Sequence, residues 1–409
     1  MTGWGERPRE PLKLTTDANS QTRGAMCTRQ DARPTTPNSM LQPTGDHFHF
    51  RLRSLNFRLP NVLEKFIRQL AGANHLSDED VRIAVDQLVD EKVPSETKAD
   101  FLCHLALKGE TVDEIASFAA ALREKSIAPL VDDSWRNSHE ILDVCGTGGD
   151  RLNTFNISTT VAIVCAAAGV PVAKHGNRAI TSQAGSADVL EELGVKIDLG
   201  PQDAARSLCE RNFAFFFAPN YHPAFKHIGP ARKLCADRGQ RTIFNFLGPL
   251  LNPARPTSQL VGVPRPELCE PLARVLRALG VRRGMVVSGK ANTASLDEFS
   301  ILGDNTIAEF YQERGFATSV MGLSEFPLNT ATLADLTGGD RKANAAIVKE
   351  LLLGKDRGAK RDAILLNAAA ALFVANKAQS FMAGWDLAAD VIDRGQAMRK
   401  LEELVTGDR

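Results

Sequence analysis

The 409-residue chain has no excess of charge of either sign, because 49 lysine and arginine residues balance 49 aspartate and glutamate residues. Without a net charge, the molecule has no general field that would attract a nucleic-acid backbone or an anionic membrane. We therefore expect neither a nucleic-acid nor a membrane partner, and any site for an anionic ligand has to be built locally.

Close cysteine pairs and long apolar runs are also absent. The 7 cysteines are scattered, odd in number and never at the spacing of metal ligands, which is typical of a reducing compartment. No apolar run is long enough to cross a bilayer, and the first residues lack the basic start and apolar stretch of a secretory signal. These absences predict a cytoplasmic protein.

The N-terminal region, residues 1–56, is polar and rich in proline, threonine, arginine and aspartate. It has no periodic hydrophobicity, so we expect a disordered extension. An organellar targeting peptide is the alternative, but acidic residues such as Glu6 and Glu10 disfavour it. A start codon placed too early would give the same pattern.

Residues 57–128 carry apolar side chains at helical spacing, as at Phe66 and Leu70. Ser77 and Thr111 each stand shortly before acidic residues, and both are predicted helix N-caps. We expect a small helical domain here. Its expected role in dimer formation is implied only by the family resemblance described below.

The remainder of the chain has a different sequence pattern, in which short apolar runs end in loops and are followed by segments with helical spacing of apolar residues. These runs cover residues 141–145, 171–173, 213–218 and 285–288. Such alternation predicts an α/β domain over residues 129–409, with a central, mostly parallel sheet flanked by helices. Ligands of such sheets bind in loops beyond the carboxyl ends of the strands, and the four motifs below lie in such loops.

The first motif is Gly146-Thr147-Gly148-Gly149-Asp150, which follows a predicted strand and shortly precedes Asn156-Ile157-Ser158-Thr159 at the head of an alanine-rich helix. Glycines let a backbone approach a phosphate, and the start of a helix offers unpaired N–H groups. The favoured interpretation is an anion site, and the alternative is a tight turn with an ordinary N-cap. The spacing matches neither a Walker loop nor a dinucleotide fingerprint.

The second motif, residues 174–182, contains two permanent cations, an imidazole, an amide and two hydroxyls. This composition favours a clamp for a polyanion over a core segment, with a solvated basic loop as the alternative. Ser186 follows and is predicted to cap a helix that begins at Ala187.

The third and fourth motifs contain charged residues that could bind a substrate or a metal ion. Arg232 follows Tyr221–His227, and its guanidinium can hold the carboxylate of an acidic co-substrate, although alone it resembles a surface residue. Asp297 and Glu298 are adjacent carboxylates, predicted in a loop just after the strand at residues 285–288. Such a pair suits Mg²⁺, which also keeps waters and substrate phosphates as ligands, although an isolated pair is usually a solvated turn.

Together, these residues resemble the anthranilate phosphoribosyltransferase family, whose members carry Gly-Thr-Gly-Gly-Asp, Asn-x-Ser-Thr, Lys-His-Gly-Asn-Arg, His-Pro-Ala and Leu-Asp-Glu in this order. The resemblance extends from about Leu59 to near the C-terminus. It implies a fold of the nucleoside phosphorylase type, a homodimer formed through the helices, and a helical domain joined by residues 222–240. It also implies a step of tryptophan biosynthesis, with phosphoribosyl pyrophosphate as donor and anthranilate as acceptor.

The resemblance further assigns roles to residues. Ser158, Asp297 and Glu298 would hold Mg²⁺, with two ions expected. The anthranilate site would be lined by Gly146, Asn177 and Arg232, with Arg232 on the carboxylate. The donor would contact Gly146, Gly149, Asp150, Thr154, Asn156, Ser158, Thr159, Lys174, His175, Gly176, Asn177, Arg178, Ala179, Ile180, Thr181, Ser182 and Ser186. No residue is expected to be catalytic beyond positioning the substrates.

Some positions depart from the pattern of the family. Ala179 stands where many members have serine, and Gln183 where they have lysine, which removes a hydroxyl and a charge from the donor loop. Ser288 replaces the typical histidine before the metal loop. Residues 235–240 form a longer link than usual after Arg232, so the surroundings of this arginine are expected to differ.

The expected reaction is displacement of pyrophosphate from C1 of the ribose by the amine of anthranilate. An aromatic amine is already a neutral nucleophile, so positioning should matter more than a strong general base. The nearest rival is a pyrimidine nucleoside phosphorylase-like enzyme, against which Arg232 and the Asp297-Glu298 pair argue. A non-catalytic relative that binds nucleic acid is the rival from another class, and the absence of net charge disfavours it.

Overall fold

The computed structural model describes residues 62–179, 183–311 and 315–407. The predicted extension over residues 1–56 and the clamp residues Ile180, Thr181 and Ser182 lie outside this described part. Among the described residues, no helix has both the length and the apolar character needed to cross a membrane.

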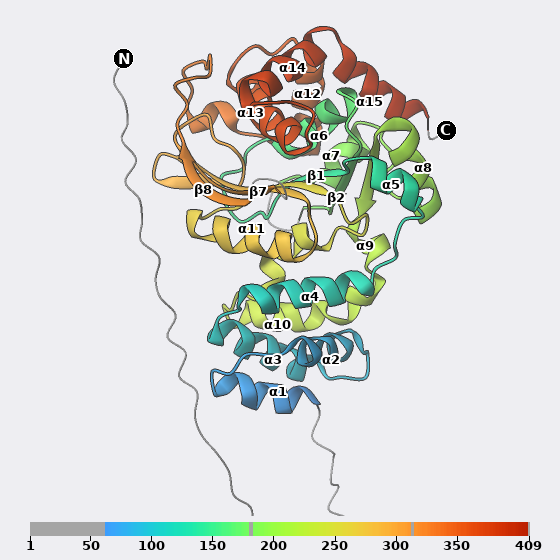
Figure 1. Ribbon diagram of the computed structural model, residues 1–409, viewed down its shortest axis with the longest axis vertical. Coiled ribbons are helices and arrows are strands. Elements are labelled where there is room, and N and C mark those ends of the chain that lie inside the picture. The colour runs from blue at the N-terminus through green and yellow to red at the C-terminus, as the bar shows by residue number, and fades with distance from the viewer. Residues whose placement is uncertain (1–61, 180–182, 312–314, 408–409) are drawn as a thin grey trace, which may run out of the picture. The chain divides into compact units, whose positions relative to one another are not determined.

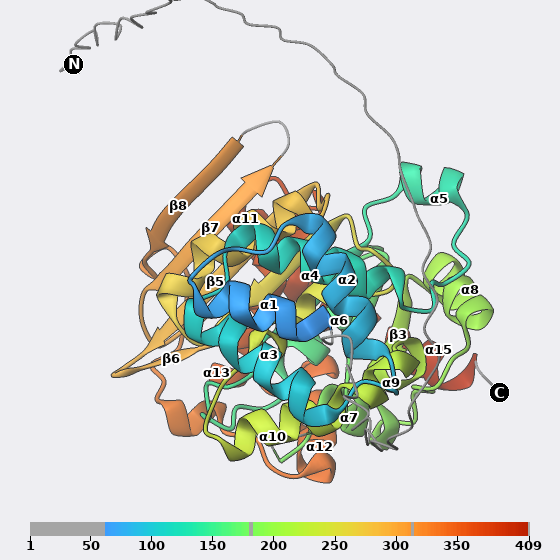
Figure 2. The same ribbon diagram turned by 90° about the horizontal axis from the view of Figure 1, so that it is seen from below.

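Four helices open the described chain, as the sequence predicts: α1 (Val62–Ala71), α2 (Asp78–Val89), α3 (Ser95–Lys108) and α4 (Val112–Glu124). Ser77 and Thr111 cap α2 and α4, each in a capping box with the acidic residue three positions on. A later helix, α10 (Gly229–Asp237), packs against α3, and Figures 1 and 2 show it among the four. The domain boundaries drawn from the sequence stay predictions.

The rest of the chain is built on an eight-stranded sheet with the order β3-β2-β1-β4-β5-β7-β8, in which β6 pairs with β5. Neighbours from β3 to β5 run parallel, and β6, β7 and β8 run antiparallel. The strands are β1 (Leu142–Gly146), β2 (Val172–Gly176), β3 (Phe213–Phe217), β4 (Ser258–Gly262), β5 (Arg283–Ala291), β6 (Ala294–Leu296), β7 (Asn305–Tyr311) and β8 (Gly315–Met321). The predicted mostly parallel sheet is confirmed, and β1, β2, β3 and β5 overlap the four predicted apolar runs, with β2 and β5 longer than predicted.

Helices flank the sheet on both faces. Figure 1 shows α6, α12, α13, α14 and α15 above it and α11 below it, towards the four N-terminal helices. The helices not yet given are α5 (Asp133–Ser138), α6 (Ile157–Ala167), α7 (Ser186–Glu192), α8 (Pro201–Arg211), α9 (Ala218–Tyr221), α11 (Cys269–Ala278), α12 (Arg341–Leu352), α13 (Ala359–Val374), α14 (Phe381–Asp393) and α15 (Gln396–Thr406). Short 3₁₀ turns are η1 (Pro223–His227), η2 (Ile243–Asn245), η3 (Gly248–Leu251), η4 (Pro266–Leu268) and η5 (Leu333–Leu336).

Two large hydrophobic clusters follow from this arrangement. Successive residues of a strand point to opposite faces, so Leu260 belongs to the cluster with α6 and α13, whereas Val261 belongs to the cluster with α11. The second cluster also contains α4 residues such as Phe118 and Leu122. The helical part, including α10, and one face of the sheet therefore share this second cluster, which holds the strands in place relative to α10.

Candidate functional site

Three parallel strands end in glycine at the same edge of the sheet: β1 at Gly146, β2 at Gly176 and β4 at Gly262. The backbone of Asp297 crosses directly over two of these ends. A Cβ atom on Gly262 would lie 1.6 Å from the Asp297 carbonyl oxygen, and one on Gly146 would lie 2.3 Å from Asp297 Oδ2. Only residues without a side chain allow this approach, so the glycines determine where the carboxylate lies.

Asp297 is bonded directly to the glycine loop. Its Oδ2 accepts a hydrogen bond from the Gly148 N–H at 2.6 Å, although 149 positions separate the two residues. The chain reaches this point because β5 and β6 form a hairpin that returns it to the sheet. The sequence placed Asp297 just after the strand at residues 285–288, but β5 continues to Ala291 and the return strand β6 comes between.

Two further carboxylates, those of Asp150 and Glu298, lie close to Asp297. Burial, together with the charges of Asp150 and Glu298, raises the pKa of Asp297 well above its usual range. Burial also raises the pKa of Glu298 to about 7. Asp150 Oδ2 is buried without a hydrogen-bond partner. Buried carboxylates that repel one another in this way are stabilised by a nearby cation.

A Mg²⁺ ion fits the chemistry of these oxygen donors. The hydroxyl and the N–H of Ser158, in the first turn of α6, both act to lower the pKa of Glu298, so the three predicted metal ligands lie together. Within the described ranges, no group of three or more His, Cys, Asp or Glu side chains is arranged to hold a metal ion. Magnesium usually takes one or two protein carboxylates and completes its shell with waters and substrate phosphates, which suits this arrangement.

Lys174 lies inside the protein. Its side chain is 1% exposed, and its Nζ donates hydrogen bonds to the Val144 carbonyl at 2.8 Å and to Ser158 Oγ at 3.4 Å. Its positive charge opposes the effect of burial on the pKa of Glu298. The predicted clamp therefore begins within β2, against the expectation that the segment is not part of the core, and Lys174 neutralises charge beneath the acidic loop.

Arg178 is held against α7. Its Nη1 donates to Asp188 Oδ1 at 3.1 Å and to Glu191 Oε2 at 2.9 Å. Asp188 Oδ2 also accepts hydrogen bonds from the N–H groups of Ala179 and Gly185, each at 2.9 Å. The two carboxylates thus hold Arg178, Ala179 and Gly185, a role of α7 that sequence reasoning missed.

The predicted cap at Ser186 is wrong by one position. Helix α7 begins at Ser186 itself, and Gly185 is its N-cap. A Cβ on Gly176 would lie 2.2 Å from Ser186 Oγ, and this hydroxyl is 3.5 Å from the Asn177 carbonyl oxygen. Ser186 therefore meets the end of β2, where the predicted donor and acceptor residues converge.

The start of α6 is fixed by a residue that sequence reasoning missed. Asn156 is the N-cap of α6, but its side chain makes no capping bond. Its Oδ1 instead accepts a hydrogen bond from Asn344 Nδ2 at 2.9 Å. In the first turn of the helix, Thr159 Oγ1 is buried without a partner, and just before the helix Thr154 forms an isolated bridge with Thr337. No local pattern could have linked Asn344 to this site, because the contact is purely tertiary.

A row of rings leads from the end of β2 to Arg232. The ring centroids of His175 and His222 are 5.2 Å apart, those of His222 and Phe225 are 4.9 Å apart, and those of Phe225 and Phe244 are 6.0 Å apart. The guanidinium of Arg232 lies 5.3 Å from the centroid of Phe244. In the described part of the chain, Arg232 has no carboxylate partner, so this row ends at a guanidinium that can bind an acid.

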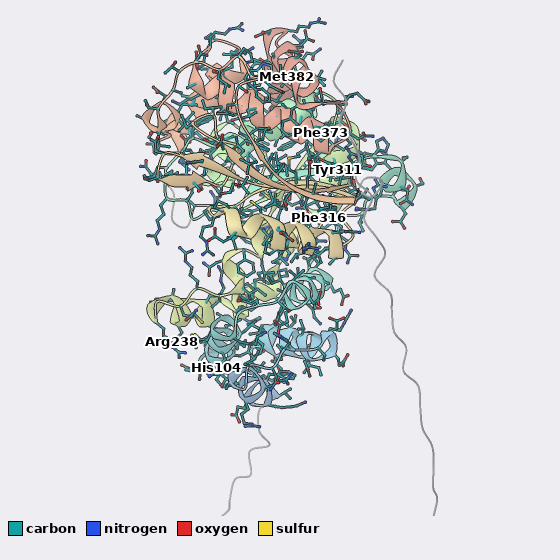
Figure 3. The ribbon with its side chains drawn as sticks, turned by 60° about the vertical axis from the view of Figure 1, so that its left-hand side comes forward. His104, Arg238, Tyr311, Phe316, Phe373 and Met382 are labelled. Carbon is teal, nitrogen blue, oxygen red and sulfur yellow. The ribbon has the colours of Figure 1, made fainter. Side chains whose placement is uncertain are left out.

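The longer link after Arg232 forms the end of α10. The helix continues to Asp237, and Gly239 leaves it with a φ of 71°. Arg238 Nη1 donates to Asp100 Oδ1 of α3 at 2.7 Å, at the junction where Figure 3 labels Arg238. The link thus adds helix on the C-terminal side of Arg232.

Comparisons with known proteins define the class. Residues 64–126 match the helical bundle domain of the glycosyl transferase family, and residues 138–398 match its a/b domain. The anthranilate phosphoribosyltransferase of Geobacter sp. (strain M21) is 44% identical over 354 residues, covering 84% of this chain and 98% of the relative. That of Petrotoga mobilis is 43% identical over 340 residues, covering 83% and 95%.

Solved structures of the same family have a similar fold. The anthranilate phosphoribosyltransferase of Thermus thermophilus has a TM-score of 0.75 and 38% identity, covering 83% of this chain and 98% of the other. That of Saccharomyces cerevisiae in complex with PRPP and Mg has a TM-score of 0.73 and 28% identity, covering 84% and 96%. The fold and the matched domains are those of a glycosyl transferase. Within this class, the chain belongs to the anthranilate phosphoribosyltransferase family.

Proposed function

We propose that this chain transfers the phosphoribosyl group of phosphoribosyl pyrophosphate to the amine of anthranilate, giving N-(5-phosphoribosyl)anthranilate and pyrophosphate in tryptophan biosynthesis. The hydrogen bond between Gly148 and Asp297 carries the proposal, because it joins a phosphate-type loop and buried carboxylates in one site. The S. cerevisiae relatives support it, since one is in complex with PRPP and Mg and another with 4-fluoroanthranilate.

The donor would lie across the ends of β1 and β2. Its phosphates would contact the glycine loop at Gly146, Gly149 and Asp150, the start of α6, and the segment from Lys174 to Ser186. Ser158, Asp297 and Glu298 would hold Mg²⁺, with two ions expected. When bound, the metal would supply positive charge to the leaving pyrophosphate.

Anthranilate would lie between the strand ends and Arg232. The aromatic row of His175, His222 and Phe225 offers ring faces and edges to a flat aromatic acid. Arg232 would hold its carboxylate, while Asn177 and Gly146 would line the side that faces the donor. This orientation directs the amine towards C1 of the ribose.

The chemistry requires a bond from the amine nitrogen to C1, cleavage of the bond from C1 to the pyrophosphate oxygen, and loss of one proton from the nitrogen. Burial and the neighbouring His222 lower the pKa of His175 to about 3, so its imidazole is neutral at physiological pH. It is therefore suited to orienting the acceptor. Holding both reactants in place can lower the barrier by about 7 to 11 kcal/mol, which makes positioning the main contribution.

A phosphorylase-like enzyme of the same fold would use inorganic phosphate and a pyrimidine nucleoside. An assay with each substrate pair separates the two. We expect loss of anthranilate fluorescence when donor and Mg²⁺ are present, and no release of free base from the nucleoside. Phosphorolysis without anthranilate consumption would overturn the proposal, and salt-dependent DNA binding without either turnover would favour a nucleic-acid-binding relative.

We also propose a homodimer formed through the helical part. Val62 of α1 is 40% exposed and Leu107 of α3 is 72% exposed, and large apolar side chains in contact with water favour association. Light scattering should give twice the mass of one chain, and Leu107→Asp should shift it towards the monomer. A monomeric wild type would contradict the proposal.

A reducing, cytoplasmic location is supported by the free thiols of all six described cysteines.

A further inference from the structure

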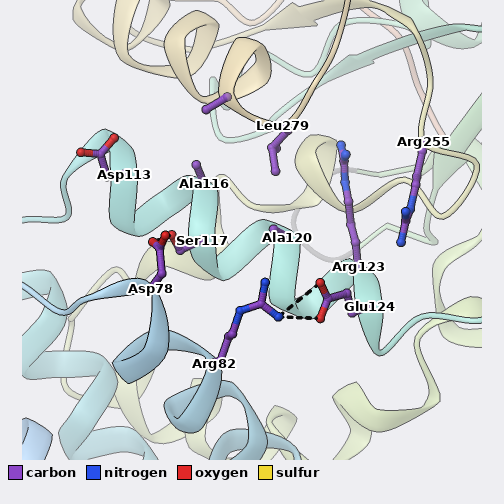
Figure 4. A pocket seen from close by; sticks show the side chains of 11 residues that line it. Asp78, Arg82, Asp113, Ala116, Ser117, Ala120, Arg123, Glu124, Arg255 and Leu279 are labelled. Carbon is purple, nitrogen blue, oxygen red and sulfur yellow. Dashed lines mark hydrogen bonds and ion pairs between the residues drawn. The ribbon is translucent and has the colours of Figure 1, made fainter.

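A polar pocket lies beside α4, near the amino end of β4. Its volume is about 440 Å³, and it is lined by α2, α4, the end of α11 and Arg255. Arg255 stands shortly before β4, at the amino ends of the parallel strands, whereas the glycine loop follows the carboxyl end of β1. In Figure 4, Arg123 extends upward from α4 and Arg255 extends downward beside it.

Arg123 forms no direct ion pair among the described residues, although the charge of buried Asp143 partly offsets its own. Its side chain is 6% exposed, its Nε donates to the Leu250 carbonyl, and its Nη2 is buried without a partner. Burial and the nearby charge of Arg255 lower the pKa of Arg123 to about 10. Among the described residues, no carboxylate pairs with either arginine. By contrast, Arg82 in the same pocket donates to Glu124 at 3.1 Å.

Arg255 is held in place by its backbone. It adopts a φ of 47°, which is unfavourable for a residue with a long side chain. Its N–H donates to the Asn252 carbonyl at 3.1 Å, and Arg136 Nη1 donates to the carbonyl oxygens of Ala254 at 2.8 Å and of Arg255 at 3.0 Å. These bonds fix the backbone from which the Arg255 side chain extends to line the same pocket as Arg123.

We propose that this pocket binds a small oxyanion, the phosphate or carboxylate group of a metabolite, between Arg123 and Arg255. Guanidinium groups bind such groups through paired N–H donors, and an anion here would relieve the repulsion between two like charges. Asp78 and Asp113 also line the pocket, and Figure 4 shows them on the other side from Arg123 and Arg255. These carboxylates repel a second negative charge, so the ligand has one anionic group and a neutral or cationic remainder.

The test uses the full chain and inorganic phosphate as the probe, with sodium chloride at equal ionic strength as reference. Arg255→Asn removes the guanidinium, and asparagine tolerates the positive φ at this position. Arg399→Asn, on α15, removes an exposed arginine and is the matched control. The rise of the melting temperature with phosphate should fall by half or more in Arg255→Asn and should be unchanged in Arg399→Asn.

Phosphate binding at the catalytic site contributes equally to all variants and cancels in this comparison. An equal rise for Arg255→Asn and Arg399→Asn would overturn the proposal. Arg123→Gln should behave like Arg255→Asn, and if it does not fold, the exposed Arg255 alone decides the result.

Discussion

Arg232 is the residue on which the choice of acceptor depends. Its guanidinium lies over Phe244 and no described carboxylate neutralises it, so it is available to a substrate carboxylate. Arg232→Ala should raise the KM for anthranilate about tenfold or more, equivalent to about 1.4 kcal/mol, with little change in the KM for the donor. Steady-state kinetics with each substrate varied measure this. Arg238→Ala, at the C-cap of the same helix, is the control, and equal rises of both KM values would remove Arg232 from the acceptor site.

His222 gives the site a pH-dependent stability. Its side chain is 4% exposed, and burial lowers its pKa to about 4. Between this value and an unfolded pKa of about 6.5, the unfolded chain binds a proton that the folded chain does not, so stability falls as the pH falls.

Going from pH 7 to pH 5 should therefore cost the wild type about 2 kcal/mol through His222, and His222→Gln should lack this loss. Urea unfolding at both pH values measures the difference. Parallel losses in wild type and variant would show that His222 does not titrate in this way.

At the scale of elements, the loop between β6 and β7 is positioned by the ends of β1 and β4. Gly262→Ala would put a methyl group 1.6 Å from the Asp297 carbonyl oxygen, so the acidic loop has to move. We expect a loss of kcat of about 100-fold and a destabilisation of about 1–3 kcal/mol. Gly200→Ala, where nothing lies within 4 Å of the added methyl group, is the control. Normal activity of Gly262→Ala would show that the loop position is not critical.

Local features of the elements could be predicted from the sequence. The caps Ser77 and Thr111, and four of the strands, depend on short-range patterns of polar and apolar residues. The sequence did not allow a prediction of strand β4 or of the antiparallel strands β6, β7 and β8, because their pairing depends on distant partners. The glycine loop and Asp297-Glu298 were identified separately as anion and metal motifs. The contact between Gly262 and Asp297 could not be derived, since close backbone approach leaves no mark in composition.

The same limit applies to charges. Lys174 and Arg178 look alike as cations of one motif, yet Lys174 is buried beneath Ser158 and Arg178 is paired with Asp188 and Glu191. The sequence shows the charge of a residue but not its partner. Because Arg178 is paired in the structure, a donor phosphate has to compete with these two carboxylates for its guanidinium.

At the scale of the whole molecule, the helical part and the sheet should unfold together. Leu122 of α4 is fully buried in the cluster that also contains Val261 and Val286 of the sheet. Leu122→Ala should lower the unfolding free energy by about 2–5 kcal/mol, and both helix content and the tryptophan fluorescence, to which Trp135 of α5 and Trp385 of α14 contribute, should report the same transition. Leu130→Ala, at a side chain that is 72% exposed, is the control. A shift in helix content that leaves the tryptophan transition unchanged would show two independent units.

The most direct test of the proposed function is a Mg²⁺ titration of anthranilate consumption, followed by fluorescence with saturating phosphoribosyl pyrophosphate. The wild type should respond to Mg²⁺, and Asp297→Asn combined with Glu298→Gln should lose about 100-fold or more of the rate together with the response to the metal. Glu402→Gln combined with Glu403→Gln, an exposed acidic pair on α15, should leave both unchanged. A double variant at Asp297 and Glu298 that still consumes anthranilate with a normal Mg²⁺ response would contradict the account.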